Sequence, residues 1–352
     1  MYLISQIEMK HIKLLNLEEL KRNSISIKLP SGEITLEVFE DAAKESDQGV
    51  GTLRLTLIRN LQFKEQLAEL MRLYCEGYKP KANTKSRTQS MSDLSIHAGP
   101  DSPLDMYPKK LESFLSVEID SASEIIKSVL STLRWRLRLE SSVYPSSQIR
   151  TYCSRDKSSG WRLIFQPESE PYFNKKQALK VDTTLLKETL ELSVIDDGGL
   201  TGHELLREAK LICNASSRAS LIMGVAAIEV RLKDLVSFLS PSSEWLIREI
   251  PSPPVVSIIK HYLAELLEIE GEGSKNDLEA FRKTEHFQRI NTAIAHRNKA
   301  SHKGHSGLND DEIYDTLNSF EQFLWFCDYL SGFEWARHYF DNELLSHLPN
   351  FK

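Results

Sequence analysis

Residues 216–239, SSRASLIMGVAAIEVRLKDLVSFL, decide the fold class of the C-terminal half of the chain. Apolar side chains recur here at three- and four-residue spacing, as on the buried face of an amphipathic helix. This stripe consists of Leu221, Val225, Ile228, Leu232, Leu235 and Leu239. The step Ser240-Pro241 ends the predicted helix, because the residue before a proline disfavours the helical conformation.

Helical patterns also flank this segment. The run Thr201-Gly202-His203-Glu204 after two glycines marks a helix start, and the pattern continues to Ile212. Further helices are predicted over Val255–Leu267, Asp277–His302 and Asp310–Leu330. If the two pieces on either side of Gly271–Gly273 count as one interrupted element, the half from residue 184 onward forms a four-helix up-and-down bundle.

The N-terminal half has a mixed pattern of helices and strands. Alternating apolar and polar residues predict strands over residues 24–28, 34–39 and 52–58, the first two joined by the hairpin signal Pro30-Ser31-Gly32. Helices are predicted over residues 61–74 and from Leu111 to about Val129. Short strands near residues 149–153 and 161–165 would form an antiparallel meander. Residues 81–108, rich in Ser, Lys, Asp and Pro, are predicted to form a loop or linker.

The segment Leu133-Arg134-Trp135-Arg136-Leu137-Arg138-Leu139 alternates strictly and predicts a half-buried strand. Its arginines Arg134, Arg136 and Arg138 would then face outward as a candidate anion-binding or RNA-binding patch. An outward row of charges is also an ordinary way to solvate a sheet or protect its edge.

The length of 352 residues fits two domains, each able to bury its own core. We expect an α+β protein with an N-terminal α/β domain over residues 1–183, in a sensing or regulatory role, and a helical bundle over residues 184–352. The first 30 residues lack a basic region followed by an apolar core, and no apolar run approaches the roughly 20 residues of a membrane span, so the chain is predicted to be cytoplasmic. Four singly placed cysteines, Cys75, Cys153, Cys213 and Cys327, indicate neither a disulfide framework nor a zinc site.

Charge is divided unevenly between the halves. Residues 1–180 contain 27 Lys and Arg against 23 Asp and Glu, a net charge of +4, and residues 181–352 contain 17 against 27, a net charge of −10. The helical half therefore lacks the basic surface that drives non-specific binding to nucleic acid. RNA would therefore have to be bound by a few residues at one place on the helical half, or by the N-terminal half.

A candidate catalytic motif lies near the end of the third predicted helical element, in Ala295-His296-Arg297-Asn298-Lys299-Ala300-Ser301-His302-Lys303-Gly304. Arg offers a permanently charged planar fork for a phosphate, and His exchanges a proton near neutral pH. The chain contains a single Arg-x4-His match, with Asn directly after the Arg. This pairing suits phosphodiester cleavage without a metal.

The motif and the order of the helices resemble the HEPN superfamily, over roughly residues 185–345. The resemblance implies a metal-independent endoribonuclease, with RNA such as tRNA as substrate, that acts as a homodimer in which two motifs meet. Prokaryotic members frequently act as toxins or as anti-phage abortive-infection effectors. A regulatory partner or ligand of the N-terminal domain fits that arrangement by analogy.

The implied reaction is attack of a ribose 2′-hydroxyl on the neighbouring phosphate, leaving a 2′,3′-cyclic phosphate. His302 would serve as general acid or base, Arg297 would stabilise the charge on the phosphate, and Asn298 would orient either of these side chains or the phosphate. Glu229, at the border of the apolar stripe, could orient Arg297, although a solvated carboxylate is the more ordinary occupant of that border. Lys299 and Lys303 are candidate RNA contacts.

Arg297 and His302 would not face a common ligand on a regular helix, because residues five apart diverge by roughly 140° around its axis. Two explanations are open, and both can hold. The helix ends at Gly304 and Gly307, so that His302 turns back, or the two residues act in sites shared between two subunits.

Alternative functions use other residues. His296, His302 and His305 share no face of a regular element, so no metal or other cofactor is expected. A non-catalytic, dimeric RNA-binding, nucleotide-binding or scaffold protein is the main alternative. A small-molecule enzyme in the N-terminal half would need a phosphate loop or nucleophile elbow, and the sequence has neither.

Overall fold

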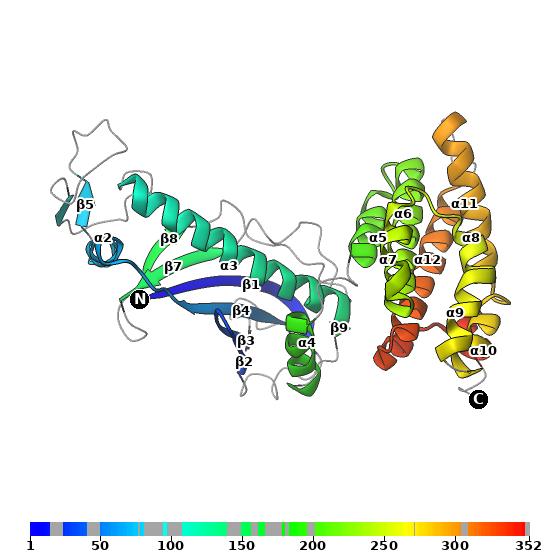
Figure 1. Cartoon of the computed structure of the whole chain (residues 1–352), viewed down its shortest axis with the longest axis horizontal. Helices are drawn as coiled ribbons and strands as arrows, with labels where there is room; N and C mark the ends of the chain where they lie inside the picture. The colour runs from blue at the N-terminus through cyan, green and yellow to red at the C-terminus, as the bar shows by residue number, and fades with distance from the viewer. Residues whose placement is uncertain are drawn as a thin grey trace. The chain divides into compact units, whose positions relative to one another are not determined.

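The computed structural model describes residues 1–14, 24–40, 50–76, 78–80, 94–96, 108–138, 149–155, 161–165, 178–179, 183–195, 201–270, 272–303 and 309–348. The chain divides into two compact units, Met1–Asp196 and Asp197–Lys352 (Figure 1). The first is built on a sheet and the second is helical, as expected for an α+β protein. The division falls after helix α4, Thr183–Ile195, which packs on the N-terminal unit.

An antiparallel sheet with the strand order β2-β3-β4-β1-β7-β8 forms the N-terminal unit, and β9 joins β1 in parallel. The strands are β1 Tyr2–Leu14, β2 Ile25–Leu29, β3 Gly32–Glu40, β4 Val50–Asn60, β7 Arg150–Ser154, β8 Arg162–Phe165 and β9 Ala178–Leu179. The predicted hairpin is confirmed, because β2 and β3 pair with Leu29 opposite Gly32. The predicted antiparallel pair near residues 149–165 is also confirmed. The strand β1, which pairs with both β4 and β7, was not predicted.

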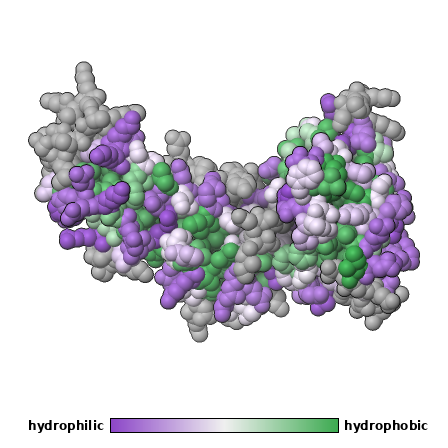
Figure 2. All heavy atoms as spheres, viewed as in Figure 1, coloured by the Kyte–Doolittle hydropathy of each residue, from purple (hydrophilic) through white to green (hydrophobic). Residues whose placement is uncertain are grey.

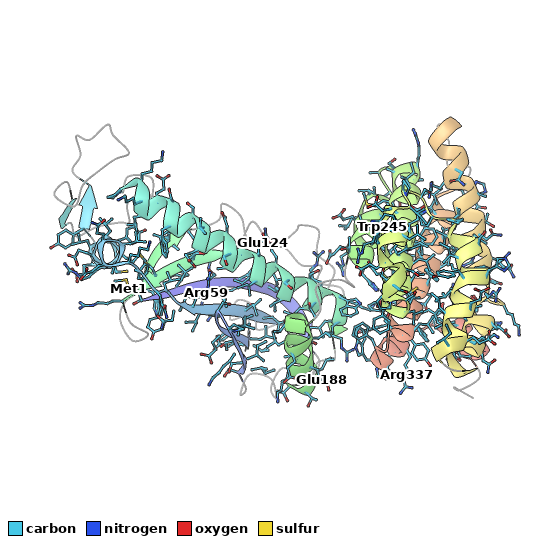
Figure 3. All side chains as sticks on the ribbon, viewed as in Figure 1. Met1, Arg59, Glu124, Glu188, Trp245 and Arg337 are labelled. Atoms are coloured by element: carbon cyan, nitrogen blue, oxygen red, sulfur yellow. The ribbon has the colours of Figure 1, made fainter. Side chains whose placement is uncertain are left out.

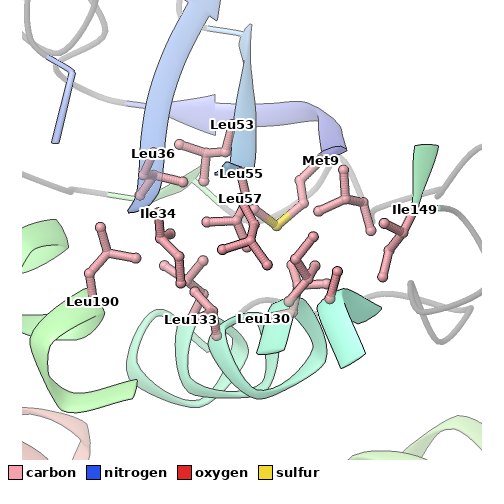
Figure 4. Packing of buried hydrophobic residues seen from close by; sticks show 14 of the residues in the cluster. Met9, Ile34, Leu36, Leu53, Leu55, Leu57, Leu130, Leu133, Ile149 and Leu190 are labelled. Atoms are coloured by element: carbon pink, nitrogen blue, oxygen red, sulfur yellow. The ribbon is translucent and has the colours of Figure 1, made fainter. Parts of the chain in front are cut away.

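Two helices cover one face of this sheet. Helix α3, Lys109–Arg136, places Leu130 and Leu133 against Leu55 and Leu57 of β4, and α4 adds Leu190 at the edge of the same core (Figure 4). The side chains of Leu53, Leu55 and Leu57 are all fully buried, as their alternation predicted. This layer of apolar side chains holds α3 against the sheet.

The predicted strand over residues 133–139 is wrong, because residues 133–136 form the last turn of α3. Every residue from Thr132 to Leu137 is buried there. The end of α3 is enclosed by its neighbours, α4 among them, so all sides of the helix carry buried residues and helical periodicity is lost from the sequence. The alternation of Leu or Trp with Arg in this segment is therefore accidental and does not indicate a strand.

Helix α2, Glu65–Cys75, lies at one end of α3 and is followed by a two-stranded sheet, β5 Tyr78–Pro80 with β6 Leu94–Ile96. The strand β6 falls within the predicted loop 81–108. The remainder of that segment, apart from Pro108, lies outside the described residues.

The C-terminal unit is built around α5 Thr201–Ile212, α6 Ser217–Leu239, α11 Glu285–Lys303 and α12 Asp310–Leu330. Helix α6 packs against the other three, and α12 also contacts α5 and α11. Shorter elements surround them: η4 Pro241–Ser243, α7 Glu244–Glu249, α8 Val255–Ser257, the π-helical turn η5 Ile258–Tyr262, α9 Leu263–Glu270, α10 Glu272–Phe281, η6 Glu334–Tyr339 and α13 Asn342–His347. The single helix predicted over residues 277–302 is in fact two, because α10 ends at Phe281 and α11 begins at Glu285.

The interior of this unit is densely packed around α6 and α12. At Gly224 of α6, an added Cβ would lie 2.8 Å from the ring of Phe320 and 2.9 Å from Leu317. Only glycine lets the two helices approach this closely. Within the described part of the chain, none of the helices is long and apolar enough to cross a membrane.

Candidate functional site

Helix α11 carries the Arg-x4-His motif, and its first turns fix it in the unit. Thr284 precedes the helix, and its hydroxyl accepts a hydrogen bond from the backbone N–H of Phe287 at 3.3 Å. Phe287, Ile290 and Ala293 are buried, so this face of α11 packs into the unit. Arg297 follows Ala293 by four residues and therefore lies on the side of α11 that turns toward the other helices.

The guanidinium of Arg297 forms an ion pair with the carboxylate of Glu229 on α6. Ser252, in the segment between α7 and α8, joins both groups: its hydroxyl donates to Glu229 Oε1 at 3.1 Å and accepts from Arg297 Nη2 at 3.3 Å. The side chains of Arg297 and Glu229 are 19% and 14% exposed, so the cluster is partly open to solvent. The contact expected between Glu229 and Arg297 is therefore present, and Ser252 is an additional member.

The segment that carries Ser252 is itself fixed to α6. Lys233, one helical turn after Glu229, donates a hydrogen bond from its ammonium group to the backbone carbonyl of Ile250. The segment after α7 is thus held at Lys233 and at Glu229, on one side of α6. The three elements α6, α11 and the segment before α8 together hold the guanidinium in one orientation.

The remaining motif residues extend along α11. Asn298 is exposed, directly after Arg297. The backbone of Lys299, His302 and Lys303 lies within α11, while their side chains lie outside the described part of the structure. Gly304 and Gly307, predicted to end the helix, also lie outside the described residues.

Helix α11 runs through His302 to Lys303. Positions 297 and 302 therefore lie roughly 140° apart around the helix axis, and about 7.5 Å apart along it. A regular helix does not direct two such positions at one phosphate. The arrangement in which His302 turns back in an unwound last turn is excluded for the backbone up to Lys303.

The second predicted anion site is not formed. Arg134 and Arg136 are 4% and 7% exposed, in the enclosed last turn of α3, instead of outward on a strand. Arg136 lies 3.8 Å from Glu188 of α4. Arg138 follows the helix with a φ of 50°, in the left-handed region. The three arginines therefore do not form an exposed row for phosphates.

A buried polar network that the sequence analysis missed joins α5, α6 and α12. Asp328 of α12 is fully buried and bonds to two groups: Arg231 Nε donates to its Oδ1 at 2.8 Å, and His203 Nε2 lies 2.7 Å from its Oδ2. Arg231 also donates to the hydroxyl of Ser331 at 2.8 Å. The ring of His203 lies against that of Trp325, 4.3 Å between centroids.

This buried network links helices α5, α6 and α12 inside the C-terminal unit. Burial acts to lower the pKa of Arg231, but the nearby acidic groups, Asp328 first among them, and the hydrogen bond to Asp328 together outweigh burial and hold the pKa above its ordinary value. The same burial raises the pKa of the neighbouring Cys327 thiol far above its usual range. A charged Arg beside a charged Asp in the interior is characteristic of a structural pair.

A signal for this network was present in the sequence. Asp328 continues the apolar stripe of α12 at four residues after Leu324, and Arg231 follows Ile228 by three on α6. Charged residues at positions that face a core need partners there. Ser252 could not be found in this way, because it lies in an irregular segment between Pro251 and Pro253.

Among the described residues, no group of three or more His, Cys, Asp and Glu side chains is arranged to hold a metal ion. His296, one of the three histidines weighed for a metal site, is half-buried on α11. The side chain of His302 and the whole of His305 fall outside the described residues.

No protein-family model, curated protein or solved structure matches this chain.

Proposed function

We propose that the protein is a metal-independent endoribonuclease that cuts RNA by attack of the 2′-hydroxyl, with Arg297 and His302 as its catalytic residues. The observation that carries the proposal is the fixed guanidinium of Arg297. Glu229 and Ser252 hold it on one side of α11, at a site that solvent reaches. A preorganised cation is what stabilises the negative charge of a phosphorane-like transition state.

The spacing of the motif favours a site made by two copies of the chain. Positions 297 and 302 lie on different sides of α11, so Arg297 of one copy would act together with His302 of the other. A two-fold pairing produces two such sites. Figure 2 shows hydrophilic residues along the edge of the C-terminal unit where α9 lies, so this edge of the unit is polar.

In this mechanism His302 moves the proton and Arg297 binds the non-bridging phosphate oxygens. The histidine takes the proton of the 2′-hydroxyl, or gives one to the leaving 5′-oxygen, and the products are a 2′,3′-cyclic phosphate and a 5′-hydroxyl. Glu229 acts through Arg297, as a positioning residue. A role as toxin or anti-phage effector, with the N-terminal unit controlling cleavage, rests on the resemblance to HEPN proteins.

The ion pair supports a second candidate function from another class. Glu229 and Arg297 also tie α6 to α11, as in a non-catalytic scaffold or RNA-binding bundle. Within this candidate, the net negative charge of the C-terminal half favours a scaffold over an RNA-binding bundle.

Cleavage of RNA in EDTA separates the two candidates. Purified protein is incubated with total RNA and a panel of tRNAs, and the ends of the products are analysed for cyclic phosphate. Under the ribonuclease proposal, Arg297→Ala and His302→Ala each abolish cleavage, a loss of at least about 100-fold. Matched controls are Arg289→Ala, a half-buried arginine on the same helix, and His347→Ala, an exposed histidine of α13.

The controls retain wild-type cleavage if the proposal is correct. Cleavage that persists in both motif variants would contradict it. If no RNA is cut, toxicity of the wild type in cells is compared with that of the two variants: equal growth of all three supports the scaffold candidate.

A further inference from the structure

Two cysteine thiols that are distant in the sequence lie side by side in the N-terminal unit. Cys75 ends α2, Cys153 lies in β7, and their sulfur atoms are 3.5 Å apart across a separation of 78 residues. Cys153 is buried and Cys75 is half-buried. The other two cysteines, Cys213 and Cys327, are buried in the C-terminal unit.

The surroundings hold the two thiols at this distance. Cys153 belongs to an apolar cluster with Leu73 and Tyr74 of α2 and Leu111 and Leu115 of α3. Cys75 packs against this cluster from its edge, as does Met1, which is labelled in Figure 3. The end of α2 is thereby fixed against β7.

An ion pair near the surface joins the same two segments. Glu76, directly after Cys75, lies 3.5 Å from Arg155, two residues after Cys153. Arg72 also bonds to Glu76, from within α2. The pair of thiols thus lies just beneath a polar surface, where a small oxidant reaches Cys75 before Cys153.

We propose that Cys75 and Cys153 form a reversible disulfide when a hydroperoxide oxidises the protein. The Cys75 thiol loses its proton and the thiolate attacks hydrogen peroxide: an S–O bond forms, the O–O bond breaks, and the leaving hydroxide takes up that proton and departs as water. The Cys153 thiol then loses its proton and the thiolate attacks the Cys75 sulfur: the S–S bond forms, the S–O bond breaks, and the leaving hydroxide takes up this second proton and departs as water. Two thiols lose two electrons in total, and the peroxide gains them.

The required movement is small. A disulfide has sulfur atoms about 2.0 Å apart, so the two sulfurs approach each other by about 1.5 Å. In cytosolic proteins, disulfides are mostly transient or redox-sensing. Here the bond would clamp α2 to β7, and would close a chain segment that includes all of α3.

Peptide mapping of the oxidised full-length protein tests the proposal. The protein is treated with graded hydrogen peroxide, alkylated and digested with trypsin without reduction. The expected product is peptide 73–81 linked to peptide 151–155, lost after treatment with dithiothreitol. In Cys153→Ser, the Cys75 sulfenic acid persists and reacts with a cyclic 1,3-dione. The matched control Cys213→Ser retains the linked peptides.

Oxidation of the wild type is expected to raise the melting temperature by about 10 °C, and no rise is expected in Cys153→Ser. An equal rise in that variant would contradict the proposal. So would oxidation that yields only Cys75-to-Cys75 links between chains, or that modifies Cys213 or Cys327 while residues 75 and 153 stay reduced.

Discussion

Removing the charge of Asp328 should destabilise the C-terminal unit more than any surface substitution. In Asp328→Asn the amide keeps the shape of the side chain but replaces one acceptor oxygen with an NH2 donor, and the guanidinium of Arg231, 3% exposed, loses the negative charge beside it. Breaking a buried ion pair by removing one charge costs about 3–5 kcal/mol of the free energy of unfolding. For a unit of this size, that corresponds to a fall in melting temperature of roughly 10 °C.

The measurement is equilibrium unfolding in urea followed by circular dichroism, for the wild type and three variants. The matched control is Asp315→Asn on the same helix, whose side chain is 57% exposed and lies 3.9 Å from Arg289. It should change the free energy of unfolding by no more than about 0.5 kcal/mol. The double variant Arg231→Met with Asp328→Asn carries neither charge, so it should regain at least about 2 kcal/mol relative to Asp328→Asn alone.

A loss of less than about 1 kcal/mol in the free energy of unfolding of Asp328→Asn would contradict this prediction. Such a small loss would mean that Arg231 pairs with another negative charge or contacts solvent. It would also mean that the contact between His203 and Asp328 does not stabilise the packing of α5 on α12.

Two further predictions concern the interior of the same unit. Burial raises the pKa of Asp277 above its ordinary value of 3.8, although the hydrogen bond from Tyr329 acts to lower it. The carboxyl group of Asp277 therefore binds its proton more tightly in the folded protein than in the unfolded chain. The stability that Asp277 contributes is complete below pH 3.8 and is lost as the pH rises through the folded pKa. Asp277→Asn should therefore gain stability relative to the wild type between pH 4 and 7, measured by urea unfolding; a pH-independent difference would contradict this. Gly224→Ala should lower stability by about 1–3 kcal/mol, because its Cβ meets Phe320, and calorimetry that finds no loss would exclude close packing of α6 on α12.

Elements with one buried face could be predicted from the sequence. The helices α5, α6 and α12 and the hairpin β2–β3 carry regular apolar periodicity, since each exposes the opposite face to solvent or to polar neighbours. The spacing of apolar residues does not predict an element that is buried on all sides. The end of α3 is buried on every side, and its alternating Leu and Arg residues therefore predicted a strand that does not exist.

The candidate site could be predicted only in part. The position of Glu229 at the border of an apolar stripe indicated its contact with Arg297, because helical periodicity fixes which residues face a neighbouring helix. Ser252 could not be predicted, since no periodicity places an irregular segment. The proximity of Cys75 and Cys153 depends on the pairing of β7 with β1, a long-range contact that spacing in the sequence does not encode.

Arg297 and His302 are proposed to act together from two copies of the chain, and the assay for such a shared site is the mixing of two inactive variants. Arg297→Ala and His302→Ala proteins are unfolded, mixed in equal amounts, refolded together and assayed on RNA in EDTA. A shared site predicts that each heterodimer regains one intact site of its two, so that the mixture recovers about a quarter of wild-type cleavage while each variant alone stays inactive. The wild type, refolded in the same way, serves as the active control. If it is active and the mixture is as inactive as each variant alone, the shared site is contradicted.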